Sequence, residues 1–282
     1  ERVAAEHEAV ARVALAPRGQ HALERATHPR DVVGDEAQRV RELDREAIAR
    51  VARQYGEAPI WLLDPTTEPA TTYPLFSDSQ VLGYDPQWSA DGRRIALFDR
   101  ASSSIFVYDF DDESGIAVPS DSGVSGALSP DGRRLIFPDI QLREGQEART
   151  YLQIADLEST AIEPMPGGDE ATNDQLAVWS PAGDAVAVAR RFLDQRFTVG
   201  YQILLINPVT GETRPLTDDT RYTNGFFSWD ANGGQLVVQR LPLIDEQGQP
   251  DNLARPEIWT LDVANGALTR VAENAFHPRW VP

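Results

Sequence analysis

An acidic stretch at residues 109 to 115 is the first place in this sequence where side chains could do chemistry. The sequence DFDDESG carries Asp109, Asp111, Asp112 and Glu113 before Gly115. A calcium loop needs ligands at set alternate positions and a closing bidentate carboxylate, and this stretch lacks that spacing. The equivalent stretches elsewhere in the chain are DLESTA, NPVTGE and DVANGA. We therefore interpret the acids as part of a hairpin turn in which the first residue ends a strand.

Two further aspartates stand in matching turns and resemble a pair of catalytic acids. Asp91 lies in WSADG and Asp131 in LSPDG. In two later copies of the same segment, the position is occupied by Ala182 and Asn232. A turn residue whose side chain bonds nearby amides fits that exchange better than a proton donor does.

Other catalytic arrangements are poorly supported by the sequence. The segment GVSGA around Ser125 comes nearest to a nucleophile elbow, but Ala127 breaks the motif. The four histidines are His7, His21, His28 and His277, so three of them precede the repeated region described below. That placement argues against a multi-histidine metal centre, and we predict no cofactor. The scarcity of histidines does not exclude a calcium site in the channel that is lined by carboxylates alone.

Composition excludes some classes of function. The 282 residues carry a net charge of −18, and no basic stripe is present to bind phosphates, so we predict no nucleic-acid partner. There is no cysteine, hence no disulfide or thiolate metal site. No apolar run approaches the roughly 20 residues of a membrane span. The sequence begins at Glu1 without methionine, and we expect a signal or a membrane or lipid anchor upstream.

Residues 1–57 differ from the rest and are predicted to form an α-helical extension. They are rich in Ala, Glu and Arg. The clearest helix starts at Asp35, an N-cap with Gln38 three residues on, and ends at Gly56. Residues 58–282 form the second predicted domain.

Two signatures recur through residues 58–282. The first is an aromatic or leucine residue, a tight turn and an apolar run, and it starts at Trp88, Leu128, Trp179, Trp229 and Trp280. The second is an apolar run closed by a turn former, and it ends at Asp64, Asp109, Asp156, Asn207 and Asp262. The first signature recurs at intervals of 40, 51, 50 and 51 residues. Each interval holds four strand-like segments, which is the size and content of a β-propeller blade.

The ends of the repeated region predict how the propeller closes. The region begins with APIWLLDP and TTYPLFSD, which read as third and fourth strands, and it stops at AFHPRWVP, which reads as a first strand. Pairing the two ends in one blade would remove exposed sheet edges. We predict an all-β propeller of five blades, four complete and one composite, with six blades as an alternative. The composite blade lacks an evident second strand, so we expect it to be three-stranded, or completed by residues 9–16, or completed by residues beyond Pro282.

The repeats resemble those of a known family. WSADG, LSPDG and WSPAG, each followed by an apolar strand and then an apolar run closed by Asp, look like the WD-repeat-like propeller units of TolB. Propellers of prolyl-oligopeptidase-type enzymes are similar, but their hydrolase domain has no room here. The resemblance implies a propeller that works outside the cytoplasm, in the periplasm or at the cell surface, and receives a partner at its channel mouth. It also leaves a metal-dependent, lactonase- or lyase-like propeller open.

One face of the predicted propeller gathers the features of a binding site. The long connections between second and third strands lie there, together with the blade entries. The residues we expect to contact a partner at this face are Asp78, Tyr84, Asp85, Asp169, Glu170, Asn173, Asp174, Asp218, Asp219, Tyr222 and Asn224. This acidic mouth with interleaved tyrosines favours a basic peptide segment or a cation. The alternative interpretation is that these acids lie on solvent-exposed loops of an acidic protein and bind no partner.

These observations favour a non-enzymatic, protein-binding scaffold of the cell envelope. The alternatives are a small-molecule enzyme with a divalent cation in the propeller channel, or a structural subunit of a membrane-associated complex. The tryptophans that recur once per blade, Trp88, Trp179, Trp229 and Trp280, are interpreted as packing anchors between adjacent blades.

Overall fold

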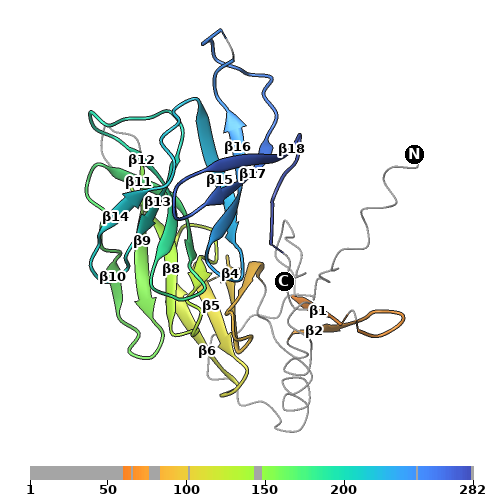
Figure 1. Ribbon diagram of the computed structural model, residues 1–282. Helices are drawn as coiled ribbons and strands as arrows, with labels where there is room; N and C mark the ends of the chain where they lie inside the picture. Colours follow the sequence, from red (N-terminus) through yellow and green to blue (C-terminus); the bar gives the residue numbers. More distant parts are fainter. Residues whose placement is uncertain are drawn as a thin grey trace. The chain divides into compact units, whose positions relative to one another are not determined.

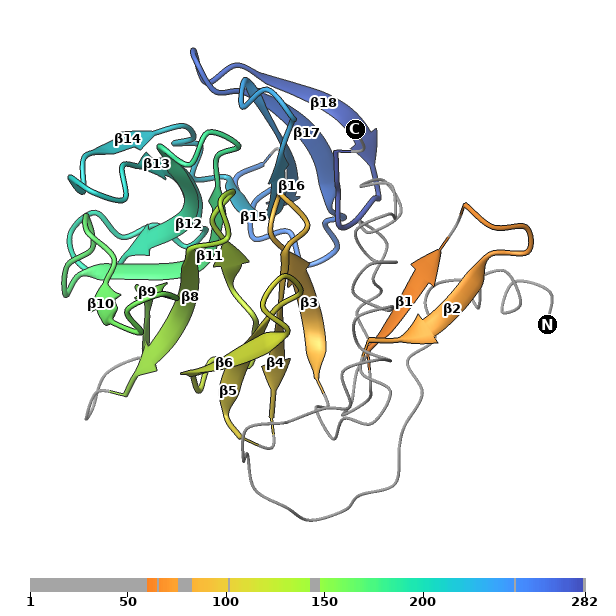
Figure 2. The ribbon, with the colours of Figure 1, turned by 90° about the horizontal axis from the view of Figure 1, so that it is seen from below.

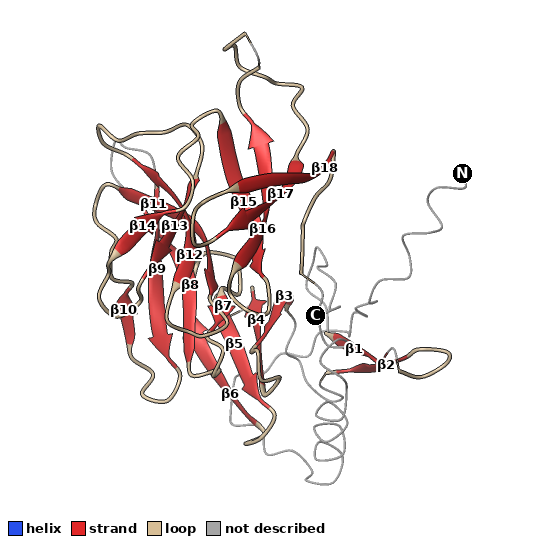
Figure 3. Ribbon diagram, viewed as in Figure 1, coloured by secondary structure: helices blue, strands red, loops and turns tan. Residues whose placement is uncertain are grey.

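A computed structural model describes residues 60–64, 66–75, 83–100, 102–142, 148–245 and 247–280 of the chain. These residues form strands and the loops between them (Figure 3). Within this part of the chain, no helix is long and apolar enough to cross a bilayer. The predicted helical extension over residues 1–57, and with it the domain boundary at residue 57, lies outside the described residues.

The chain divides into two compact units, residues 1–125 and 126–282. The first unit contains a two-stranded sheet, β1 (Trp61–Asp64) and β2 (Thr71–Pro74). It also contains a four-stranded sheet of β3 (Tyr84–Trp88), β4 (Arg94–Asp99), β5 (Ser104–Asp109) and β6 (Ser114–Pro119) (Figure 1). The two sheets share a core in which Ile60, Leu62 and Leu75 pack with residues of β4 and β5. The strands of β3–β6 are those that the sequence predicts.

The second unit contains three further four-stranded antiparallel sheets. The first consists of β7 (Ala127–Leu128), β8 (Arg134–Gln141), β9 (Arg149–Asp156) and β10 (Ile162–Pro164). The second consists of β11 (Thr172–Trp179), β12 (Val186–Phe192), β13 (Gln202–Ile206) and β14 (Thr213–Pro215). The third consists of β15 (Tyr222–Trp229), β16 (Gln235–Pro242), β17 (Glu257–Asp262) and β18 (Leu268–Glu273). Figure 2 shows these sheets following one another within the unit. Each is a consecutive meander, the strand order of a propeller blade, so the all-β propeller prediction is confirmed.

The tight turn between the first two strands of each sheet is built by its own side chains. In the β3–β4 turn, Asp91 Oδ1 accepts hydrogen bonds from Ser89 Oγ at 2.5 Å and from the Arg93 amide at 3.0 Å. Gly92 follows with φ of 71°, a conformation that glycine adopts without a steric penalty. Asp131 accepts from Ser129 Oγ at 2.6 Å in the next sheet. Both aspartates therefore act as turn residues, as the sequence predicts.

The acidic stretch after β5 is a second kind of turn. Asp109 Oδ1 accepts hydrogen bonds from the amides of Asp111 at 2.8 Å and Asp112 at 3.3 Å. Its other oxygen accepts from Arg94 Nε at 2.7 Å. Asp156 and Asn207 cap the following turns of their own sheets in the same way. The interpretation of this stretch as a hairpin turn is confirmed.

Stability should fall in acid through this aspartate. Burial alone would raise the pKa of Asp109, but the hydrogen bonds from Arg94 and the amides of Asp111 and Asp112 lower it below 3.8. Since the folded pKa is depressed, the stabilisation is complete above about pH 5 and is lost as pH falls through the folded value. We expect Asp109→Asn to flatten the dependence of the urea midpoint on pH between 2 and 5. Parallel curves for the two proteins would contradict this account.

Three of the four first strands, β3, β11 and β15, carry a register irregularity that a period-two pattern does not predict. Asp85, Phe226 and His277 all have positive φ, of 54°, 45° and 49°, and each lies three residues before a recurring tryptophan. In β15 this residue is the extra one, because the pairing with β16 shifts between Gly225 and Phe227. A bulge bends its strand and changes the direction of its side chain.

The C-terminal residues repeat the entry contact of a first strand without forming one. The Ala275 amide donates to the Pro256 carbonyl at 3.1 Å, just as the Asn224 amide donates to the Tyr201 carbonyl at 2.9 Å one sheet earlier. Residues 275–280 have no strand assignment. The segment is thus placed against β17 as β15 is placed against β13, while its pairing in a composite blade stays a prediction.

Two of the four recurring tryptophans tie neighbouring sheets together. Trp179 Nε1 donates to the Ala127 carbonyl in β7 at 3.1 Å, and Trp229 Nε1 donates to the Val178 carbonyl in β11 at 3.2 Å. Both rings are buried. Trp88 stacks on Phe110 within the first unit, with ring centroids 5.4 Å apart, and Trp280 is 37% exposed.

Candidate partner-binding face

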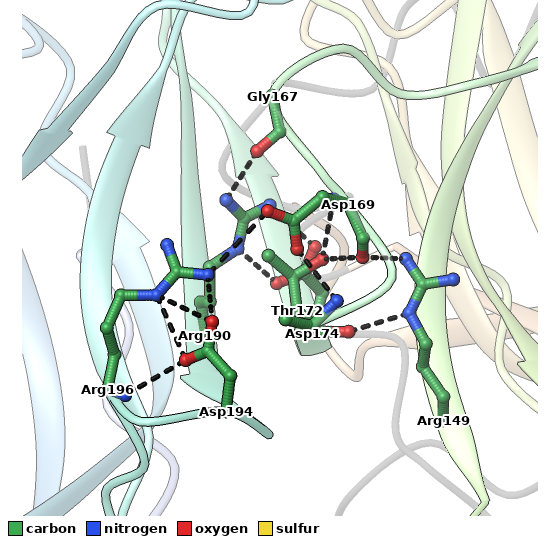
Figure 4. A network of polar contacts seen from close by, with 9 residues as sticks. Arg149, Gly167, Asp169, Thr172, Asp174, Arg190, Asp194 and Arg196 are labelled. Carbon is green, nitrogen blue, oxygen red and sulfur yellow. Dashed lines mark hydrogen bonds and ion pairs between the residues drawn. The ribbon is translucent and has the colours of Figure 1, made fainter.

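The loop that enters β11 is held by two buried arginines (Figure 4). Arg149, in β9, donates from Nε to the Thr172 carbonyl at 2.8 Å and from Nη2 to the Asp169 carbonyl. Arg190, in β12, donates from Nη1 to the Gly167 carbonyl at 2.6 Å. These bonds hold the carbonyls of Gly167 and Asp169 in the loop and that of Thr172, the first residue of β11. The loop therefore presents Asp169 and Glu170, both exposed, from a fixed backbone.

The loop that enters β15 is fixed in a similar way. Gln202 Nε2 donates to the carbonyls of Asp219 at 3.2 Å and Tyr222 at 3.1 Å. Gln202 Oε1 accepts from Thr217 Oγ1 at 2.9 Å. Asp218 is exposed, and Asp219 and Tyr222 are half-buried.

Four of the residues expected to contact a partner are buried. Asp85 is 8% exposed, and Asn173, Asp174 and Asn224 are each 2% exposed. These four side chains are therefore not on the exposed surface, while the partner-binding role of the predicted face stays a prediction. Asp78 lies outside the described residues.

Each buried side chain has a structural partner that explains its position. Asp174 accepts from Arg190 Nε at 2.6 Å and from Nη2 at 2.8 Å, across the β11–β12 pair. Asn173 Oδ1 accepts from the Thr150 amide at 3.2 Å. Asp85 Oδ2 accepts from the Ser125 amide at 3.2 Å.

The expected residues that remain accessible are Asp169, Glu170, Asp218, Asp219 and Tyr222 in the second unit. Tyr84, in the first unit, is half-buried, and the Arg100 guanidinium lies 5.7 Å from its ring centroid. The structure does not place residues of the first unit beside those of the second. The face that can be described as one surface therefore belongs to residues 126–280.

Arginines neutralise part of the acidity of this face. Arg221 lies 2.8 Å from Asp219, and its hydrogen bond is the main reason that the pKa of Asp219 is lowered. Arg196 lies 2.7 Å from Asp194 and lowers the pKa of that carboxyl in the same way. The face is thus a mixture of charges, less acidic than the expected residues suggest.

Exposed apolar side chains on the same connections were missed by the sequence prediction. They are Leu142 (83% exposed), Phe197 (53%), Val199 (69%) and Leu253 (88%). They belong to the connections from β8 to β9, from β12 to β13 and from β16 to β17. Because the three meanders have the same strand order, these connections leave the sheets at the same end. The available signal was one or two large apolar residues in each of the polar segments QLREGQ, DQRFTVG and PDNLARP.

In the residues that the structure describes, no three His, Asp or Glu side chains gather as metal ligands would. The alternative of a divalent cation in the channel stays a prediction.

Comparison with solved structures identifies the fold. TolB from Acinetobacter baumannii superposes with a TM-score of 0.54 and 17% identity, over 83% of this chain and 52% of TolB. Oligogalacturonate lyase in complex with manganese gives a TM-score of 0.54 and 14% identity, over 77% of this chain and 59% of the lyase. The tricorn protease gives 0.54 and 12%, over 77% of this chain and 24% of the protease.

These likenesses establish a TolB-like β-propeller fold. The chain spans about half the length of TolB and of the lyase. No protein-family model matches the sequence. No curated protein matches it either.

Proposed function

We propose that the chain is a protein-binding scaffold that receives its partner on the end of the second unit where Leu142, Phe197 and Leu253 are exposed. The exposure of these side chains on neighbouring connections is the observation that carries the proposal. Scattered exposed apolar residues are normal on a protein surface, but one on each of three adjacent long loops is typical of an interaction site. The fixed loops that enter β11 and β15 supply the polar rim.

The chemistry of the rim favours a partner segment with basic side chains. Asp169, Glu170 and Asp218 are exposed there, and the whole chain carries a charge of −18. Attraction of this kind accelerates encounter and orients the partner, while the apolar contacts supply most of the affinity. A role in the cell envelope, with an upstream anchor, is part of the same proposal and is supported by the TolB-like fold.

The proposal is tested by removing the apolar contacts without changing the fold. In the triple variant Leu142→Ser, Phe197→Ser and Leu253→Ser, we expect capture of partners from an envelope extract to fall at least about tenfold, the loss that follows from removing about 1.4 kcal/mol of binding energy. Val209→Ser is the matched control, because Val209 is 75% exposed but lies in the turn between β13 and β14, at the other end of its sheet.

Two outcomes decide the test. Partners that bind wild type and Val209→Ser, but not the triple variant, identify the loop end as the binding face. If the triple variant retains every partner at the wild-type level, the proposed face is wrong.

A further inference from the structure

Arg240, in β16, is a buried cation whose hydrogen bonds are incomplete. The residue is 2% exposed. Its Nε donates to Asn224 Oδ1 at 3.1 Å, which is a neutral acceptor. Its Nη2 is buried and has no hydrogen-bond partner. A buried charged donor without an acceptor is costly, so this group is where a ligand would gain most.

The sheet before it shows how the same position is normally satisfied. Arg190 occupies in β12 the place that Arg240 occupies in β16, eleven residues after the recurring tryptophan. There, Asp174 fills the guanidinium fork with both carboxylate oxygens, at 2.6 and 2.8 Å. Asn224 stands at the position of Asp174 in the later sheet and offers one oxygen. A carboxylate is therefore the group that Arg240 lacks.

Two aromatic rings, set edge to face, lie against this guanidinium. The Tyr222 ring centroid lies 4.0 Å from the Arg240 Cζ atom, and the Trp259 centroid lies 5.1 Å away. Ring faces attract a cation but do not accept hydrogen bonds from N–H groups in the guanidinium plane as an oxygen does. The two rings therefore pack against Arg240 without supplying the hydrogen-bond acceptor that Nη2 lacks.

The carboxylates near Arg240 are engaged elsewhere. Glu257 pairs with Arg240 across β16 and β17, and its carboxylate accepts hydrogen bonds from Trp259 Nε1 at 2.8 Å and from Arg270 Nη1 at 3.1 Å. Asp219 Oδ2 lies 3.9 Å from Arg240 Nη2, beyond hydrogen-bond distance. Arg221 binds that carboxylate from Nε at 3.0 Å and from Nη2 at 2.8 Å. The side chain of Arg221 is 65% exposed and that of Asp219 is 28% exposed, so this ion pair separates Arg240 from solvent.

We propose that Arg240 is the centre of an anion site that binds a small monocarboxylate, which reaches Nη2 when the Asp219–Arg221 pair moves aside. The carboxylate binds the guanidinium of Arg240 as Asp174 binds that of Arg190. Tyr222 and Trp259 form the apolar walls, and a short alkyl or hydrogen substituent faces them. This site needs no partner chain, although its Asp219–Arg221 pair lies in the loop entering β15 that supplies part of the polar rim.

Formate is the probe for this site, and Trp259 is the reporter. Sodium formate should cause a saturable change in tryptophan fluorescence that equimolar sodium chloride does not cause. In Arg240→Met the formate-specific change should be lost, with binding at least about tenfold weaker. In Asn224→Asp a carboxylate is supplied from within, so the change should be lost there as well. Trp259→Phe should remove most of the fluorescence change caused by formate. Formate should still bind this variant and raise its thermal unfolding midpoint.

Arg240→Met and Asn224→Asp together protect the test against a misfolded variant. The first removes the cation that binds formate, and the second fills the site with a carboxylate of the protein. A wild-type response to formate no larger than that to chloride would overturn the proposal. So would a formate response in folded Arg240→Met equal to that of wild type. Neither result bears on partner capture by the loop end, so the two proposals can fail separately.

Discussion

Asp174→Asn is expected to lower the free energy of unfolding of the second unit by about 3 to 5 kcal/mol, the cost of removing one partner from a buried ion pair. The side chains of Asp174 and Arg190 are each 3% exposed. Both carboxylate oxygens bind the guanidinium, and no water replaces the lost charge at that depth. An amide keeps the shape of the carboxylate but points one N–H donor at the guanidinium, so part of the fork meets repulsion.

Urea denaturation followed by circular dichroism measures this loss. Asp194→Asn is the matched control, because Asp194 forms an ion pair of similar length with Arg196 at 2.7 Å but its side chain is 38% exposed. An exposed pair contributes about 0 to 1 kcal/mol, so the control should unfold close to wild type. If Asp174→Asn and Asp194→Asn lost the same free energy of unfolding, burial would not be what makes the Asp174–Arg190 ion pair stabilising.

The sequence was sufficient to predict the repeated sheets, because their signal is local. A turn such as that at Asp91 needs a Ser two residues before it and a Gly after it, and all of this lies within a few residues. The capping of the turn after β5 by Asp109 is local in the same sense. Repetition then allowed one copy to be checked against another, which separated turn aspartates from catalytic ones.

The accessible residues of the face could not be predicted in the same way. Asp174 and Asn224 lie in polar segments that read as loops, yet the structure places them inside β11 and β15. What buries them is their pairing with Arg190 and Arg240 on the next strand. That pairing depends on register, and the bulges in β11 and β15 shift the register in a way that no local pattern reports.

The exposed loop residues pose the opposite problem. Leu142 and Leu253 are isolated apolar residues in polar segments, and such residues fold back onto a core as often as they face solvent. Whether they do so depends on the length and path of the whole connection. The sequence therefore pointed to the loop end, and binding of a partner there stays a prediction. It did not show that the expected acids Asp169 and Asp219 have Arg196 and Arg221 as ion-pair partners.

Trp179→Leu is expected to cost about 3 kcal/mol or more, in the range measured when large aromatic side chains are removed from a core. Trp179 is 5% exposed and packs with Ile136 and Val188. Its indole also donates to the Ala127 carbonyl at 3.1 Å, and the Arg134 guanidinium lies 4.6 Å from its ring centroid. Leucine keeps some of the packing but leaves a cavity. It also leaves the Ala127 carbonyl without its hydrogen-bond donor.

The chain itself provides the comparison. Leu128 occupies the equivalent position one sheet earlier and is 7% exposed, so a leucine can be buried at this point of the repeat. The cost in Trp179→Leu should therefore come from the lost volume and the lost bond between sheets, not from an incompatible backbone. Trp280→Leu is the control, because Trp280 is 37% exposed and should cost less than about 1 kcal/mol. Chemical denaturation of both variants measures the difference, and a Trp179→Leu protein as stable as Trp280→Leu would show that the bond from Trp179 to β7 does not hold the sheets together.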